Sequence, residues 1–156
     1  MDGLSVVILN FNRPDFIKKN IIPSLKKNRI VDEIVVSHGK ESTFFDHPDV
    51  RSLKHWGKYN TKWGLSRRFL SGSLCKNKWI MIMDDDIIPD KKTVTTLFQN
   101  VKKEKDIIHG IYGRSLKRGY SVENCFGEVP IVLTRCLVTT RDMCEYYLQN
   151  FRDFES

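Results

Sequence analysis

The 156-residue sequence lacks the features that mark several common protein classes. None of its four cysteines belongs to a C-x-x-C pair, which argues against a structural zinc site. No Asn-x-Ser/Thr acceptor occurs, and no apolar run approaches the ~20 residues that a membrane helix needs. The N-terminus has neither the basic region nor the apolar stretch of a signal peptide. These absences predict a soluble, cytoplasmic protein without a membrane span.

The composition is that of one ordinary globular domain. Apolar residues make up 40% of the chain and charged residues 29%, so a core can form without disulfides or metals. The net charge of +7 suits anionic partners such as phosphorylated small molecules, although it also serves solubility. The lysines are scattered over expected helices instead of forming one stripe. We therefore expect no nucleic acid as a partner.

Short β-branched runs alternate with helical patterns along the chain, which predicts an α/β fold with a mixed, mainly parallel sheet flanked by helices. Pro14 suits the first position of a helix, and Pro23 should weaken that helix. The aromatic segment 56–64 is interpreted as a loop. Strands are expected at 4–9, 33–37, 50–55, 79–83, 107–112 and 131–138, the last antiparallel, and helices at 14–28, 65–74, 90–103 and 140–151.

An acidic triplet, Asp84-Asp85-Asp86, ends the most apolar of these runs, Trp79 to Met83. Adjacent carboxylates repel one another, so at the end of a buried strand they indicate a bound cation. In a strand Asp84 and Asp86 point to one side and Asp85 to the other. Mg²⁺ or Mn²⁺ often takes one or two carboxylates and completes its shell with substrate phosphates. The alternative is a solvated acidic turn before a helix.

Polar residues also follow two other expected strands. Asn10 to Arg13 follows the first strand, and Ser37-His38 ends the second. Ligands of open parallel sheets bind at the carboxyl ends of strands. The three strand ends therefore predict one binding site, with the triplet as its metal-binding part.

The order of these segments resembles that of GT-A fold glycosyltransferases, and most of all the exostosin C-terminal domain class. The likeness is carried by residues 7–13, 33–37, 66–69 and 79–88, and is weaker onward to about Tyr147. It implies a Rossmann-like GT-A domain over residues 1–156. It also implies a metal-dependent, anomer-retaining glycosyltransferase that moves a hexose or deoxyhexose from a UDP-sugar to a glycan or glycoprotein acceptor.

The resemblance also assigns roles to individual residues. Asp86 would ligate Mn²⁺ or Mg²⁺, with Asp84 as its companion ligand near the ribose or sugar. The triplet as a whole would be the D-x-D motif of the class, with Asp85 as a further donor contact. The remaining contacts to the nucleotide and donor would come from Leu9, Asn10, Arg13, Ser37, His38, Asn60 and Arg68.

The sequence departs from that class at its end. The acceptor-side segment and its carboxylate have no counterpart before Ser156, so the domain is expected to lack them and the catalytic residue stays unassigned. The absence of an anchor favours a microbial or viral relative. The oligomeric state is left open.

Three other functions compete with this interpretation. A sugar-phosphate nucleotidyltransferase should carry a Gly-rich phosphate loop after the first strand, and Asn10 to Pro14 contains no glycine. A metal phosphohydrolase should have a small or hydroxylated residue soon after its nucleophilic Asp, and Ile87-Ile88-Pro89 supplies none. A non-catalytic basic nucleic-acid-binding domain would bind in a salt-dependent, metal-independent way.

Overall fold

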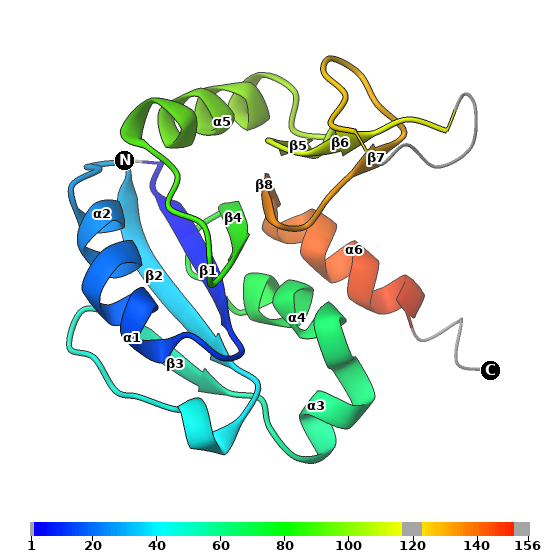
Figure 1. Cartoon of the computed structure of the whole chain (residues 1–156). Helices are drawn as coiled ribbons and strands as arrows, with labels where there is room; N and C mark the ends of the chain where they lie inside the picture. Colours follow the sequence, from blue (N-terminus) through cyan, green and yellow to red (C-terminus); the bar gives the residue numbers. More distant parts are fainter. Residues whose placement is uncertain (1, 117–122, 152–156) are drawn as a thin grey trace.

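The computed structural model describes residues 2–116 and 123–151, apart from the side chains of Tyr59 and Asn60. A six-stranded mixed, mainly parallel sheet forms the centre, with helices on both faces (Figure 1). Two further strands, β6 (Gly113–Arg114) and β7 (Ile131–Val132), pair with each other beside it. The order across the main sheet is β3 (Arg51–Lys54), β2 (Val31–His38), β1 (Leu4–Asn10), β4 (Trp79–Asp84), β8 (Cys136–Thr140) and β5 (His109–Gly110).

The first helical segment is interrupted one turn before Pro23. It begins with α1 (Pro14–Phe16), passes through a π-helical turn at Ile17–Ile21 and ends as α2 (Ile22–Lys26). Pro14 occupies the first turn, where its missing N–H costs no hydrogen bond. Pro23 cannot donate to the turn before it, which accounts for the wider π turn at this point.

The remaining helices are α3 (Lys58–Trp63), α4 (Arg67–Ser73), α5 (Lys91–Lys103) and α6 (Arg141–Phe151). Asp90 caps α5 as predicted, because its carboxylate accepts a hydrogen bond from the Thr93 N–H at 2.6 Å. In the described part of the chain no helix is long and apolar enough to cross a membrane.

Strand alternation divides the core into two layers. Val6, Ile8 and Met81 face α1, α2 and α5, whereas Val7 and Ile82 face α4 and α6. β1 and β4 supply side chains to both layers and are buried on both faces. The apolar run at residues 79–83 is therefore central, as its composition predicts.

Three sequence expectations need correction. The segment 57–64, expected as a loop, contains α3, preceded by Gly57 at a φ of 66°. The expected strand 131–138 is two strands, because β7 pairs with β6 and the chain turns before β8 pairs antiparallel with β4. The expected strand 107–112 is reduced to β5, at the edge of the sheet.

Candidate functional site

The acidic triplet lies where the strand order reverses direction. β1 pairs with β2 on one side and with β4 on the other, and all three strands are parallel. The β1–β2 connection packs on one face of the sheet, and α4, which precedes β4, packs on the opposite face. Open α/β sheets commonly bind ligands outside the carboxyl ends of the strands at such a switch point. We call this region the crevice; the turn after β1 and the triplet after β4 form its two sides.

Asp85 ties these two sides together. Its Oδ2 accepts hydrogen bonds from the backbone N–H groups of Phe11 and Asn12 at 3.0 and 3.1 Å, and its Oδ1 accepts one from Arg13 at 2.8 Å. Burial alone would raise the pKa of Asp85, but these three donors outweigh burial and hold the pKa below its ordinary value. Asp85 is thus a buried, ionised carboxylate that fixes the β1 turn.

Asp84 lies on the α4 side of the sheet. Its Oδ1 is 3.4 Å from a terminal nitrogen of Arg68, which α4 supplies. Burial raises the pKa of Asp84, the neighbouring Asp86 adds to this, and Arg68 opposes it. The surroundings of these two adjacent carboxylates therefore act in opposite directions: they favour the ionised form of Asp85 and disfavour that of Asp84.

Asp86 is the most exposed member of the triplet, with 37% of its side chain accessible. Its Oδ2 lies 3.9 Å from the guanidinium of Arg13 and 3.9 Å from that of Arg135. Neither distance is short enough for a hydrogen bond. Asp86 therefore offers an accessible carboxylate at the mouth of the crevice.

Strand alternation separates the other predicted residues into two sets. Leu9 packs in the layer that faces α4, and the Ser37 hydroxyl lies 3.2 Å from His55 Nδ1 on the same face. Asn10 and His38 point to the opposite face, where both side chains are fully buried. The structure thus brings Leu9, Ser37 and Asp84 to one side of the crevice, and Asn10 and His38 to the other side of the sheet.

Asn10 and His38 form a fixed pair. Asn10 Nδ2 donates to the Thr43 carbonyl at 2.7 Å and lies 2.9 Å from His38 Nδ1. Because an amide nitrogen only donates, His38 Nδ1 accepts and the ring proton resides on Nε2, 3.4 Å from the Ser52 hydroxyl. Burial lowers the pKa of His38 to about 4, so the ring is neutral at pH 7. Asn10 Oδ1 has no hydrogen-bond partner among the described residues.

The start of α4 brings two arginines to the site. Arg68 donates to the carbonyls of Leu65 and Thr134 at 3.0 and 2.9 Å, and burial lowers its pKa. Arg67, which was not among the predicted site residues, is 2% exposed and lies against Gly39, where a Cβ would overlap its guanidinium. Burial and the charge of Arg68 lower the pKa of Arg67, and Asp85 opposes them. Both cations therefore stand behind the crevice.

Two other predicted positions have a simpler outcome. Asn60 lies in α3, on the chain that leads into α4, but its side chain is outside the described residues. Arg13 is at the crevice, half exposed and bonded to Asp85.

The donor set fits a divalent cation only together with a ligand. In the part of the chain that the structure describes, no three His, Cys, Asp or Glu side chains form a group that could hold a metal ion. Asp85 is fully engaged with the β1 turn, which leaves Asp86, and Asp84 beside it, as carboxylates that face the crevice. One or two carboxylates completed by phosphate oxygens is a common Mg²⁺ arrangement.

Comparison with known proteins identifies the family of this chain. Residues 4–154 match the glycosyl transferase family 64 domain. The chain belongs to this family. It is also 27% identical over 114 residues to the uncharacterized glycosyltransferase MG060 of Mycoplasma genitalium, a match that covers 65% of this chain and 38% of that protein.

A solved structure of another protein has a fold similar to that of this chain. The crystal structure of S. aureus TarS residues 1–349 superposes with a TM-score of 0.63 over 92% of this chain and 48% of that one, at 14% sequence identity. Both matched proteins are thus at least twice as long as the region that this chain covers. At this identity the likeness supports the fold alone.

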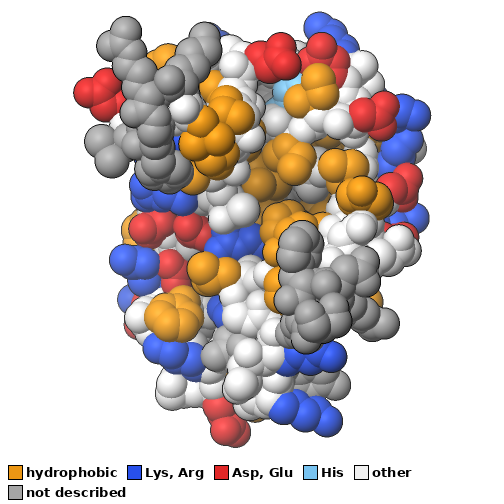
Figure 2. All heavy atoms as spheres, turned by 90° about the vertical axis from the view of Figure 1, so that its right-hand side faces the viewer, with side chains coloured by type: hydrophobic (Ala, Val, Ile, Leu, Met, Phe, Trp, Pro, Cys, Tyr) orange, Lys and Arg blue, Asp and Glu red, His pale blue; other side chains and the backbone are white. Residues whose placement is uncertain are grey.

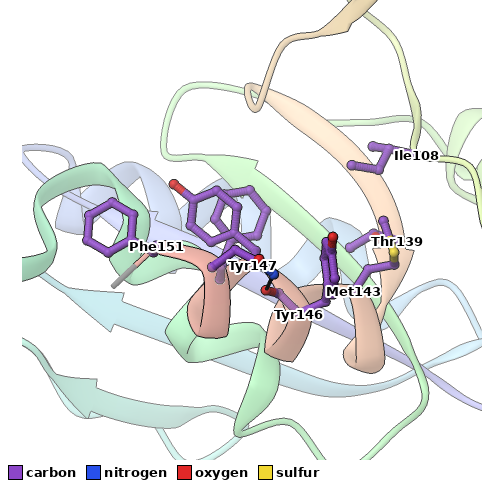
Figure 3. Close-up of a pocket in the computed structure, with 8 residues that line it drawn as sticks. Ile108, Thr139, Met143, Tyr146, Tyr147 and Phe151 are labelled. Carbon is purple, nitrogen blue, oxygen red and sulfur yellow. Dashed lines mark hydrogen bonds between the residues drawn. The ribbon is translucent and has the colours of Figure 1, made fainter. Parts of the chain in front are cut away.

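A cavity of the family 64 domain lies away from the strand ends. It measures about 460 Å³ and lies between α4, α6 and the segment before β5 (Figure 3). Its lining is mainly aromatic and apolar, with Phe69, Met143, Tyr147 and Phe151 among its residues, and contains no charged side chain. Figure 2 views the side on which α6 lies, and hydrophobic side chains gather near the middle of that face. This cavity offers no group for acid–base or metal chemistry.

Proposed function

We propose that this family 64 domain is a glycosyltransferase that takes a UDP-sugar as donor and works with Mn²⁺ or Mg²⁺. The observation that carries the proposal is that the three carboxylates of the acidic triplet have different roles at the switch point. Asp85 fixes the turn opposite, while Asp84 and Asp86 present carboxylates to the crevice. A site for a diphosphate with its cation needs this combination of a rigid rim and accessible oxygens.

The metal is held by few protein ligands in this proposal. Asp86 would ligate the ion with Asp84 beside it, and phosphate oxygens of the donor would supply the remaining ligands. When bound, the ion supplies charge stabilisation to the departing nucleoside diphosphate without a proton. Arg68 holds Asp84 in place at 3.4 Å, and Arg13 keeps the β1 turn against Asp85 at 2.8 Å.

The nucleoside lies between the ends of β1 and β2 and the start of α4. Leu9 and Ser37 face this side of the sheet, and Asn60 belongs to α3, which precedes α4 in the chain. Asn10 and His38 act beneath the base by holding the segment that follows β2, because the Asn10 amide is bonded to the Thr43 carbonyl. Arg67 and Arg68 place positive charge behind the phosphates.

The finer assignments rest on the likeness to the exostosin class. They are retention of the anomeric configuration, transfer of a hexose or deoxyhexose, and a glycan or glycoprotein acceptor. The match to the family 64 domain supports glycosyl transfer at the coarser level. The crevice residues described above belong to the donor side of such a reaction.

A nucleotide and donor panel tests the proposal. We expect UDP to bind more tightly than ADP, GDP or CDP in the presence of Mn²⁺, as measured by isothermal titration calorimetry. We also expect one or more UDP-sugars to be hydrolysed slowly without acceptor, with the first-formed anomer of the sugar, read by NMR, matching the donor. Equal binding of all four nucleotides would refute the UDP assignment, and an inverted anomer would refute retention alone.

A further inference from the structure

Arg135 lies directly across from the start of the acidic triplet. It belongs to the short link between β7 and β8, and its carbonyl accepts a hydrogen bond from the Asp84 N–H at 2.9 Å. This bond continues the antiparallel pairing of β4 with β8 by one residue. The backbone of Arg135 is therefore fixed to the strand that carries the triplet.

The side chain of Arg135 reaches the mouth of the crevice. Its guanidinium lies over the ring of Tyr112, 4.8 Å from the ring centre, and 3.9 Å from Asp86 Oδ2. About half of the side chain is exposed. Stacking on an aromatic face restricts a guanidinium while leaving its in-plane N–H groups available.

The other arginines of the crevice differ from Arg135 in this respect. Arg68 donates to two backbone carbonyls, and Arg13 donates to Asp85 at 2.8 Å. The Arg135 guanidinium makes no hydrogen bond to any of the residues that the structure describes, and its contact with Asp86 is an ion pair at long range. A positioned cation with unused donors beside a diphosphate site is suited to bidentate phosphate binding.

We propose that Arg135 binds the diphosphate of the donor, as a cation contributed by the second half of the chain. This proposal rests on the proposed function and adds to it a residue that sequence motifs did not indicate. The guanidinium donates to the phosphate oxygens while Tyr112 keeps it oriented. The site thereby acquires a second partly exposed cation, with Asp86 between Arg135 and Arg13.

The test compares UDP with uridine in the full chain. Binding of both is measured by NMR titration with diamagnetic Mg²⁺ present, for the wild type, Arg135→Ala and Arg135→Gln. Because only UDP carries the phosphates, we expect both variants to bind UDP roughly tenfold more weakly and uridine as the wild type does. Arg29→Ala is the matched control, since Arg29 is exposed before β2, at the opposite ends of the strands.

The outcomes separate the two proposals. If the wild type does not bind UDP, the proposed function fails and Arg135 has no diphosphate to bind. If the wild type binds UDP and both variants bind it equally well, only the role of Arg135 is refuted. An equal loss for UDP and uridine would also refute it, because such a loss reports a displaced strand instead of a missing phosphate contact. Urea midpoints of all variants identify that case.

Discussion

Replacing Asp85 with Asn should destabilise the protein, whereas the same change at Asp84 should not. The Asp85 carboxylate accepts two backbone hydrogen bonds and one from Arg13, and the residue is 4% exposed. An amide has a single acceptor oxygen, so at least one of these donors loses its partner and the others lose a charged acceptor. Bonds to charged groups contribute ~1.5–3 kcal/mol each and neutral ones ~1 kcal/mol, so weakening the two backbone bonds alone predicts a loss of about 1–4 kcal/mol.

Asp84→Asn is the matched control for this prediction. Burial raises the pKa of Asp84, which means that the fold disfavours its charge, so removing the charge should leave stability unchanged or increase it. Urea denaturation followed by circular dichroism measures both variants. For a urea slope of ~2 kcal/mol/M the Asp85→Asn midpoint should fall by about 0.5–2 M. The reasoning is refuted if the two variants lose equal stability, or if Asp85→Asn unfolds with the wild type.

The pH dependence of this effect has a defined sign. The folded pKa of Asp85 is lowered relative to the unfolded chain, where it is ~3.9. Its contribution to stability is therefore complete above pH ~4 and is lost as the pH falls through the folded pKa. The difference between wild type and Asp85→Asn should accordingly be constant from pH 5 to 7 and shrink only in strong acid.

Three further predictions concern other parts of the molecule. Burial lowers the pKa of His38 to about 4, so the stability of the wild type should rise with pH between ~4 and ~6.5. The urea midpoint of His38→Gln should not rise with pH over this range, and a parallel rise in both proteins would contradict the prediction. Glu33→Ala should lower the free energy of unfolding by about 2–3 kcal/mol, because the Glu33 carboxylate accepts hydrogen bonds from the Lys76 backbone N–H and from the Ser5 hydroxyl in β1. An unchanged urea midpoint would count against this. Gly39→Ala should weaken UDP binding, measured by calorimetry, without a matching loss of stability, because a Cβ at this position would displace the Arg67 guanidinium. An unaltered affinity for UDP would exclude Arg67 from the site.

The central strands were predictable because their signal is local. β1, β2 and β4 are buried runs of apolar residues, and Asp90 caps α5 through its own side chain. In both cases the physical cause lies within a few residues of its effect. The strand ends at Asp84, so the expected strand alternation does not extend to Asp85 and Asp86, which follow it in a turn.

The remaining features depend on partners far along the chain. The run 131–138 divides because β7 pairs with β6 and β8 with β4, and nothing in its composition indicates two partners. Arg135 reaches the crevice only through its backbone bond to Asp84. Arg67 belongs to a pair of arginines at a helix start, which by itself is more typical of a solvated surface. Its burial follows from the packing of α4 against β1 and β2.

Titration of UDP into the protein with and without Mn²⁺, for the wild type and for Asp86→Ala, tests the central claim most directly. Asp86 is the most exposed carboxylate of the triplet, and its nearest charged neighbours lie 3.9 Å away, so its removal should leave the fold intact. We predict that Mn²⁺ strengthens UDP binding by the wild type and has no such effect on the variant. Metal-independent binding by the wild type, or unchanged metal-assisted binding by Asp86→Ala, would contradict the role of the triplet as a metal and nucleotide-sugar site.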